Sequence, residues 1–355
     1  MWVRFKAVPA AKKLQGWAPP PTTVRINITH LCNLRCKMCG QWRRKETYRK
    51  EMLPIGRLKE IVDEVASFKP EIYVWGGEPF LYPDITEFIT YVKQKKIPLL
   101  LGTNGVLLQK YAREMVTLRV DSINISIDGP GEINDKIRGV FGGFNKVIQG
   151  VTLINQIRHD LKRKKPMLKM ICTISEMNQL YLEETLNVAI KSGLFDVLIF
   201  GLGWFTTEEI GYANNKLFQR LFGCESTSWK SFVNALGKVD PVKVQKLMQS
   251  VRRNLHKVPV VFFPNIGSEE VPTYYFKPNI PVGKKMCLSP WVDLDIRPNG
   301  DVTFCPDYPD YILGNVKRES LLKVWNGDKA RKFRKALTEY GVFPICSRCC
   351  GLYTY

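Results

Sequence analysis

Six short runs of aliphatic and β-branched residues alternate with amphipathic segments between residues 23 and 204. The runs are predicted strands, and the segments between them carry apolar residues at helical spacing. The predicted strands are Val24–Ile28, Ile72–Trp75, Leu99–Leu101, Ser122–Ile127, Met167–Ile174 and Val197–Gly201. Strands that alternate with helices in chain order indicate parallel βαβ units with right-handed crossovers. We therefore predict an α/β fold, an open parallel (β/α)6 partial barrel, because the pattern breaks after Gly201.

The rest of the chain divides into three parts around this predicted barrel at 23–204. Residues 1–22 are expected to form an irregular lead-in that ends in three prolines. Residues 205–285 are predicted to be mostly helical and are interpreted as a bridge or insertion. Residues 286–355 contain an Asn299-Gly300 turn signal between two short β runs, which predicts a hairpin. We expect this last part to be a small α+β extension that binds a metal cluster.

The charge balance is basic, with 53 Lys and Arg residues against 33 Asp and Glu residues. An anionic substrate would suit this charge, and a generally basic solvated surface would explain it equally well. The basic clusters are short and do not alternate with aromatic residues, so nucleic-acid binding is not indicated. The sequence contains no apolar run of about 18 residues that would predict a membrane span, and its N-terminus does not resemble a secretion signal. We expect a cytoplasmic protein.

Three cysteines, Cys32, Cys36 and Cys39, follow the first predicted strand at close spacing. Clustered thiols in a chain without an export signal are more often metal ligands than disulfide partners. Three thiolates on one loop can hold three irons of a 4Fe–4S cluster, which leaves the fourth iron free to bind a small molecule. Zinc is the alternative, but it needs a fourth ligand and only His30 lies nearby in the sequence.

Three further motifs stand at the ends of predicted strands. They are Gly76-Gly77-Glu78-Pro79 after the second strand, Ser126 and Asp128 after the fourth with Arg138 ten residues beyond, and Leu202 after the sixth. Each motif alone could be an ordinary turn or strand end. Together with the C-x3-C-x2-C triplet, and in this order, they resemble the radical S-adenosylmethionine (radical SAM) superfamily. One difference is Met38 before the third cysteine, where that family often has an aromatic residue.

The resemblance implies a reaction and a set of contacts. A reduced 4Fe–4S cluster on the cysteine triplet would cleave SAM, and the resulting 5′-deoxyadenosyl radical would abstract hydrogen from a substrate. The Gly76–Pro79 segment would contact the methionine amino group, where the Glu78 carboxylate would suit an ammonium. Ser126 would touch the ribose, Arg138 the methionine carboxylate, and Leu202 would lie beside the adenine. A low-potential electron donor such as flavodoxin or ferredoxin is also implied.

Five more cysteines lie in the last 69 residues: Cys287, Cys305, Cys346, Cys349 and Cys350. Two of them flank the predicted hairpin, and a C-x2-C pair follows from a later loop. The surrounding motifs, Pro290-Trp291, Gly300-x4-Cys305, Gly314-Asn315 and Trp325-Asn326-Gly327, resemble the SPASM/twitch extension of the same superfamily. This resemblance implies one auxiliary 4Fe–4S cluster with the ligands Cys287, Cys305, Cys346 and Cys349, with Cys350 as the alternative fourth ligand. A zinc ribbon is the competing interpretation.

Three functions are weighed for this chain. The first is a radical SAM enzyme for a small anionic or cofactor-like metabolite, with the auxiliary cluster relaying electrons. The second is a maturase or epimerase of a ribosomally made peptide, in which Cys224 is a candidate hydrogen-atom donor. The third is a non-catalytic zinc or nucleic-acid binding protein, which would leave the strand-end motifs without a role. The remaining cysteine, Cys172, is predicted to be a buried apolar residue.

Overall fold

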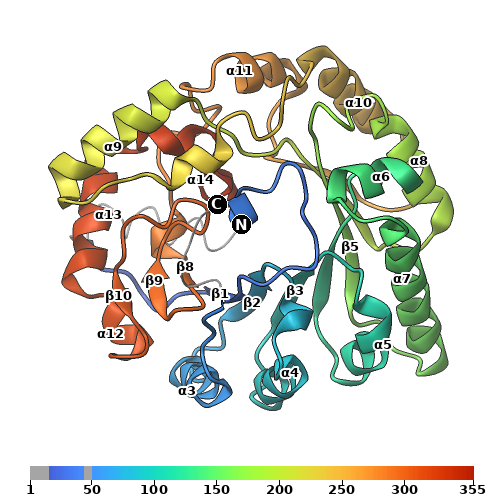
Figure 1. Cartoon of the computed structure of the whole chain (residues 1–355), viewed down its shortest axis with the longest axis horizontal. Helices are drawn as coiled ribbons and strands as arrows, with labels where there is room; N and C mark the ends of the chain where they lie inside the picture. The colour runs from blue at the N-terminus through green and yellow to red at the C-terminus, as the bar shows by residue number, and fades with distance from the viewer. Residues whose placement is uncertain (1–15, 44–49) are drawn as a thin grey trace.

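The computed structural model describes residues 16–43 and 50–355. In this part of the chain ten strands form one sheet in the order β10-β9-β8-β1-β2-β3-β4-β5-β6-β7. The strands that pair in parallel are β1 (Thr23–Thr29), β2 (Glu71–Gly76), β3 (Leu99–Thr103), β4 (Ser122–Ser126), β5 (Met167–Thr173), β6 (Val197–Gly201), β7 (Val260–Phe263) and β8 (Asp293–Ile296). Figure 1 shows these strands as an incomplete ring with helices on its outside. The predicted α/β partial barrel is confirmed.

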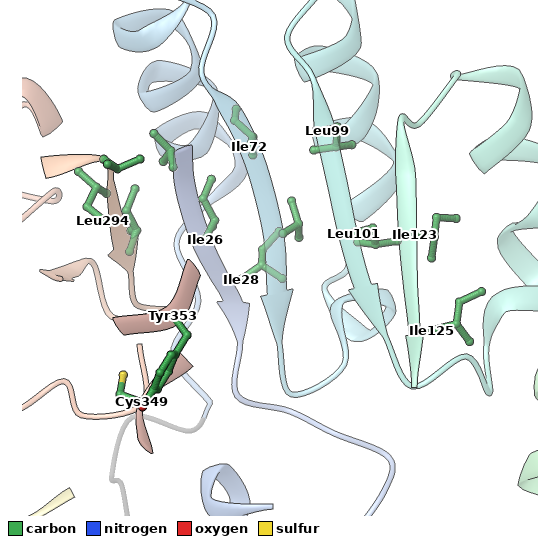
Figure 2. Packing of buried hydrophobic residues seen from close by; sticks show 14 of the residues in the cluster. Ile26, Ile28, Ile72, Leu99, Leu101, Ile123, Ile125, Leu294, Cys349 and Tyr353 are labelled. Carbon is green, nitrogen blue, oxygen red and sulfur yellow. The ribbon is translucent and has the colours of Figure 1, made fainter. Parts of the chain in front are cut away.

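The helices between the first strands form the outer layer of this ring. They are α3 (Ile55–Val65), α4 (Ile85–Gln94), α5 (Leu108–Thr117), α6 (Gly131–Arg138), α7 (Gly143–Asp160) and α8 (Leu182–Ser192). In α3 the buried residues are Leu58, Ile61, Val62 and Val65, the spacing of one helix face. On the sheet, Ile26, Ile72, Leu99 and Ile123 belong to the same core, and Figure 2 shows them on neighbouring strands. Alternation along each strand turns these side chains toward the helices.

The bridge contributes one strand as well as helices. It contains α9 (Glu208–Phe222), η2 (Ser228–Phe232), α10 (Pro241–Arg253), β7, η3 (Ser268–Glu270) and α11 (Val271–Phe276). Because β7 pairs in parallel with β6, the barrel sheet extends one strand beyond the six that the sequence predicts. Within the described residues no helix is both long and apolar enough to cross a membrane.

The C-terminal part is joined to the barrel through the sheet. It contains η4 (Ser289–Trp291), β8, β9 (Asp301–Thr303), β10 (Gly314–Asn315), α12 (Leu321–Trp325), α13 (Asp328–Tyr340), η5 (Pro344–Arg348) and α14 (Cys350–Thr354). Strand β8 pairs in parallel with β1, and β9 and β10 follow as the antiparallel hairpin edge. The C-terminus lies inside the ring (Figure 1). This arrangement brings the last cysteines to the side of β1 that faces away from the helices.

On β1 and β8, the face of the sheet that points into the ring carries polar side chains. Strand β1 directs Arg25 and Asn27 away from the apolar core residues of the same strand, and β8 does so with Asp293 and Asp295. All four side chains are at least nine-tenths buried. Strands of parallel sheets are usually apolar on both faces. These four buried polar side chains, Arg25, Asn27, Asp293 and Asp295, are an exception to that pattern and are called the polar wall below.

Candidate functional site

The loop that carries Cys32, Cys36 and Cys39 is held against the end of β2. The Gly77 N–H donates to the Thr29 carbonyl at 2.7 Å, and the Glu78 N–H donates to the Leu31 carbonyl at 2.7 Å. A Cβ atom on Gly77 would lie 2.2 Å from that Leu31 oxygen. Only glycine permits this approach, so the Gly-Gly-Glu-Pro motif is required for packing on the cysteine loop.

Two of the three cysteine sulfurs, those of Cys32 and Cys36, lie near hydrogen-bond donors. The Leu34 N–H is 3.4 Å and the Asn104 amide nitrogen 3.9 Å from the Cys32 Sγ. Arg138 Nη1 is 4.0 Å from the Cys36 Sγ. Donors around cluster sulfurs are typical of iron–sulfur sites, whose potentials they tune.

Glu78 is fully buried, and its carboxylate is bound by the chain itself. It accepts hydrogen bonds from the Phe80 N–H at 3.2 Å, the Thr103 hydroxyl at 2.8 Å and the Asn104 N–H at 2.8 Å. Burial raises the pKa of this carboxyl to about 7. Three donors of the chain thus already bind the Glu78 carboxylate, two at Oε1 and one at Oε2. Glu78 joins the ends of β2 and β3 and positions Asn104.

Asn104 is a site residue that the sequence reasoning missed. Its side-chain N–H₂ group donates to Asn33 Oδ1 at 2.8 Å as well as approaching the Cys32 sulfur. It follows Thr103 at the end of β3. A polar residue directly after a parallel strand is the signal that could have identified it, because the carboxyl ends of parallel strands form the site in such folds.

Arg138 and Asp128 form a buried ion pair beside Cys36. Arg138 Nη2 lies 2.5 Å from Asp128 Oδ2, and the other Asp128 oxygen accepts the Thr173 N–H at 2.8 Å. Burial raises the pKa of the Asp128 carboxyl, and the Arg138 charge opposes that rise. The Arg138 Nε atom is buried and has no hydrogen-bond partner among the described residues. A guanidinium with an unused N–H next to a cluster cysteine fits an anionic group of a bound ligand.

Ser126 and Leu202 lie at strand ends as the sequence places them. Ser126 is the last residue of β4 and is half-buried. Leu202 follows β6, is fully buried, and its carbonyl accepts the Tyr275 hydroxyl at 2.9 Å. Together with the Gly76–Pro79 segment and Arg138, these residues occupy successive positions along one edge of the barrel.

The second cysteine group comes together from three separate segments, which carry Cys287, Cys305 and the Cys346–Cys349 pair. Burial raises the pKa of the Cys305 thiol well above its usual value, and the nearby Cys346 and Cys287 sulfurs add to the effect. Cys349 also lies within electrostatic range of Cys305 and Cys346. Four sulfurs that meet in one buried place fit an iron–sulfur cluster with a complete set of cysteine ligands.

Cys350 has a different environment from Cys349. Its Sγ donates to Asp307 Oδ2 at 3.3 Å, and Arg25 on the inner face of β1 is among its electrostatic neighbours. Asp307 was not singled out from the sequence, although it follows Cys305 by only two residues. The Cys350 Sγ also lies within 4.8 Å of the Cys349 Sγ and of an Asp307 carboxylate oxygen. Cys349 and Cys350 therefore both remain candidates for the fourth ligand.

The two remaining cysteines belong to neither group, although Cys172 is an electrostatic neighbour of Asp128 and Arg138. Cys172 is fully buried in β5, as predicted. Cys224 follows α9, and its electrostatic neighbours are Asp310 and the α13 residues Lys329 and Lys332. Helices α9 and α13 lie at the outside of the ring (Figure 1). The structure thus does not bring Cys224 to the other site residues, and it gives no support to the hydrogen-atom donor hypothesis.

Arg348 connects the second cysteine group to the bridge. Its buried guanidinium donates to five backbone carbonyls, those of Thr273, Tyr274, Lys277, Ile280 and Ser347. The hydroxyl of Tyr274 in turn donates to the Gly203 carbonyl at 2.5 Å, just beyond β6. One side chain therefore holds the loop between Cys346 and Cys349 against α11 and the end of the barrel.

Replacing Arg348 with Leu is expected to destabilise the protein by about 3 kcal/mol or more, because several buried carbonyls lose their donor at about 1–3 kcal/mol each. Thermal unfolding of Arg348→Leu should show a clearly lower Tm than the wild type. Arg331→Leu is the matched control, since Arg331 is 39% exposed and its guanidinium pairs with Asp328 in the same helix. Equal melting temperatures for the two variants would refute the connecting role of Arg348.

Comparison with known proteins gives two family matches. Residues 26–189 match the radical SAM superfamily, and residues 287–350 match SPASM, an iron–sulfur cluster-binding domain. Pre-heme d1 synthase of Dinoroseobacter shibae is 24% identical over 336 residues, which cover 90% of this chain and 76% of that protein. Fe-coproporphyrin III synthase of Methanosarcina barkeri is 32% identical over 127 residues, 35% of this chain and 32% of that protein. A probable GTP 3′,8-cyclase of Methanococcus maripaludis is 31% identical over 43% of this chain and 52% of its own length.

Solved structures show the same fold at low sequence identity. Streptococcus suis SuiB bound to its precursor peptide SuiA has a TM-score of 0.65 at 14% identity, and the match covers 92% of this chain and 69% of SuiB. The enzyme anSMEcpe with bound AdoMet has a TM-score of 0.61 at 18% identity, over 90% of this chain and 81% of its own. Both likenesses concern the fold alone. They cover the barrel together with the C-terminal part.

Proposed function

Because the chain belongs to the radical SAM superfamily and ends in a SPASM iron–sulfur cluster-binding domain, we propose that its two cysteine groups hold two 4Fe–4S clusters. Cys32, Cys36 and Cys39 would hold the cluster that binds SAM. Cys287, Cys305, Cys346 and Cys349 would hold one auxiliary cluster. When bound, the reduced cluster and SAM supply a 5′-deoxyadenosyl radical that abstracts hydrogen from a substrate.

The residues of the chain would bind and orient SAM at the strand ends. Arg138 is held by Asp128 and has an unused N–H, which suits the methionine carboxylate. Gly76 and Gly77 allow the backbone to approach the amino group, while Glu78 fixes the neighbouring strand ends. Ser126 would face the ribose, and Leu202 the adenine.

We propose a small, carboxylate-bearing, cofactor-like metabolite as the substrate. The observation that carries this is the buried polar wall on β1 and β8, which lies near Cys350 of the auxiliary group. A buried guanidinium such as that of Arg25 is suited to binding a carboxylate. The relative that matches 90% of this chain carries the name of a synthase for a cofactor precursor, which agrees with this class. The auxiliary cluster would then accept an electron from the substrate.

Peptide maturation is the second candidate. The fold matches SuiB with its bound precursor peptide over 92% of this chain. The two candidates differ in the substrate that is modified, and co-expression with short peptides encoded beside the gene separates them. For either candidate we propose a cytoplasmic enzyme. We propose a flavodoxin or ferredoxin as the electron donor, and the exposed Arg35 and Lys37 on the cysteine loop would suit an acidic surface on it.

The reconstituted, dithionite-reduced protein is expected to cleave SAM to 5′-deoxyadenosine and methionine. Cys39→Ala should reduce this to background, because a three-cysteine site that loses one ligand no longer holds the cluster. Cys172→Ala is the control, since Cys172 is a buried cysteine in neither group. Liquid chromatography of 5′-deoxyadenosine measures the reaction. Wild-type protein that forms none above a protein-free blank would refute the proposed function.

A further inference from the structure

Asn27 on the inner face of β1 is buried without a hydrogen bond. Its side chain is 1% exposed. Neither its amide oxygen nor its amide nitrogen has a partner among the described residues. Buried polar groups in native proteins are nearly always paired, because an unpaired one keeps its full desolvation cost. An amide that carries this cost on both atoms therefore needs a reason beyond folding.

Two charged residues next to Asn27 are only partly satisfied. Arg25 lies two residues earlier on the same face, and its Nη2 atom is 2.5 Å from Asp293 Oδ2 while its Nη1 atom has no hydrogen bond. Asp295 is the partner of Arg25 across the β1–β8 pairing. Its Oδ1 accepts the Trp75 indole N–H at 2.7 Å, while its Oδ2 accepts no hydrogen bond from the described residues and lies 3.8 Å from Arg297 Nη1 in an ion pair. These side chains thus present a guanidinium N–H₂ group without a hydrogen bond, a carboxylate oxygen that is ion-paired but not hydrogen-bonded, and an amide without a partner among the described residues.

The polar wall lies between the two cysteine groups. A Cβ atom on Gly76 would be 2.9 Å from Asn27 Oδ1, so Asn27 adjoins the segment that packs on the first cysteine loop. Arg25 is an electrostatic neighbour of Cys350, which follows Cys349 of the second group. A molecule bound against Arg25 and Asn27 would therefore sit between the proposed SAM site and the proposed auxiliary cluster.

We propose that Arg25, Asn27 and Asp295 form a substrate subsite, which binds a group with a carboxylate or carbonyl oxygen toward Arg25 and an N–H or O–H donor toward Asp295. The proposal rests on the radical SAM function above and specifies the substrate chemistry at its centre. Arg25 has Asp293 and Asp295 beside it, so the wall is not a purely cationic site. It favours a carboxylate accompanied by an N–H or O–H donor over a simple anion. The methionine end of SAM also carries a carboxylate and an N–H donor, so SAM itself is the alternative ligand of this subsite.

Thermal unfolding tests whether the Asn27 amide stabilises the fold, as opposed to serving only to bind a ligand. Asn27→Leu replaces the amide with an apolar side chain of similar size, and we expect its Tm to equal the wild-type value or exceed it by roughly 2 °C. Asn178→Leu is the matched control. Asn178 is also fully buried, but its amide accepts from the Ser175 N–H at 2.8 Å and donates to the Thr173 carbonyl at 2.8 Å. That variant should melt clearly below the wild type. A Tm for Asn27→Leu below the wild type would overturn the proposal.

Isothermal titration with SAM tests whether the subsite binds the substrate or the methionine end of SAM. If the subsite serves the substrate, Asn27→Leu binds SAM with a Kd within about twofold of the wild type. A loss of tenfold or more, about 1.4 kcal/mol, would assign the subsite to the methionine end of SAM and overturn the substrate assignment. Neither measurement requires turnover. The proposed function fails separately, if the wild type forms no 5′-deoxyadenosine.

Discussion

Changing Cys32, Cys36 and Cys39 together to Ala is expected to halve the iron content of the anaerobically reconstituted protein, from about eight to about four irons per chain. The reason is that the two cysteine groups draw their ligands from separate loops, so loss of the first cluster leaves the second intact. Formation of 5′-deoxyadenosine should fall to background in the same variant. Iron and sulfide analysis with a parallel zinc determination measures the result.

Single changes in the second group identify its fourth ligand. On the proposed assignment, Cys349→Ala should lose about four irons, while Cys350→Ala should retain about eight. The reverse result would make Cys350 the fourth ligand, since its sulfur lies within 4.8 Å of the Cys349 sulfur. A wild-type content of about four irons that falls to none in the triple variant would show that the C-terminal cysteines hold no iron. Zinc in that preparation would favour the zinc-ribbon interpretation of the C-terminal group.

Arg138→Met is expected to destabilise the protein by about 3–5 kcal/mol, the usual effect of removing one partner from a buried ion pair. Asp128 is fully buried, so its carboxylate would lose its counter-charge in a place that water does not reach. The variant should also bind SAM at least tenfold more weakly, because the donor beside Cys36 is lost. Chemical unfolding and titration with SAM measure the two effects.

The double variant Asp128→Asn/Arg138→Met separates stability from binding. A neutral amide at position 128 removes the unpaired charge, so most of the lost stability should return while SAM binding stays weak. Arg113→Met on the exposed side of α5 is the control for replacing an arginine with methionine. Recovery of SAM binding in the double variant would mean that Arg138 only balances Asp128 and does not contact the ligand.

The barrel could be predicted because its signals are local. The six β runs and the amphipathic helices between them each depend on side chains a few residues apart, and a βαβ unit has one favoured handedness. The seventh parallel strand was not assigned to the barrel. Strand β7 is only Val260–Phe263, and its place depends on pairing with β6 across more than 50 intervening residues, about which local sequence carries no information.

The parts of the candidate site that could be predicted are those marked by characteristic residue spacing in the sequence. The cysteine triplet, the glycine pair and Arg138 are recognisable from their positions after strands, and the structure places them along one edge. For Glu78 the sequence suggests contact with a ligand, and the structure adds that its carboxylate accepts hydrogen bonds from Thr103 and two backbone N–H groups. Two of these hydrogen bonds come from Thr103 and Asn104 at the end of β3, which local sequence does not place next to Glu78. Polar residues alternating along Val24–Ile28 were the unused signal for the inner wall.

The sequence by itself determined the α/β barrel, its family and the cysteines that can bind iron, because periodicity and ligand spacing are properties of short segments. Only the tertiary structure decided which polar groups face each other inside the barrel. Arg25 and Asp293 are 268 residues apart in the chain and 2.5 Å apart in space. Strand β8 pairs with β1 rather than forming a separate unit. Such contacts depend on how the C-terminal part closes on the barrel, and burial there gives the unpaired atoms of Asn27 and Arg25 their significance.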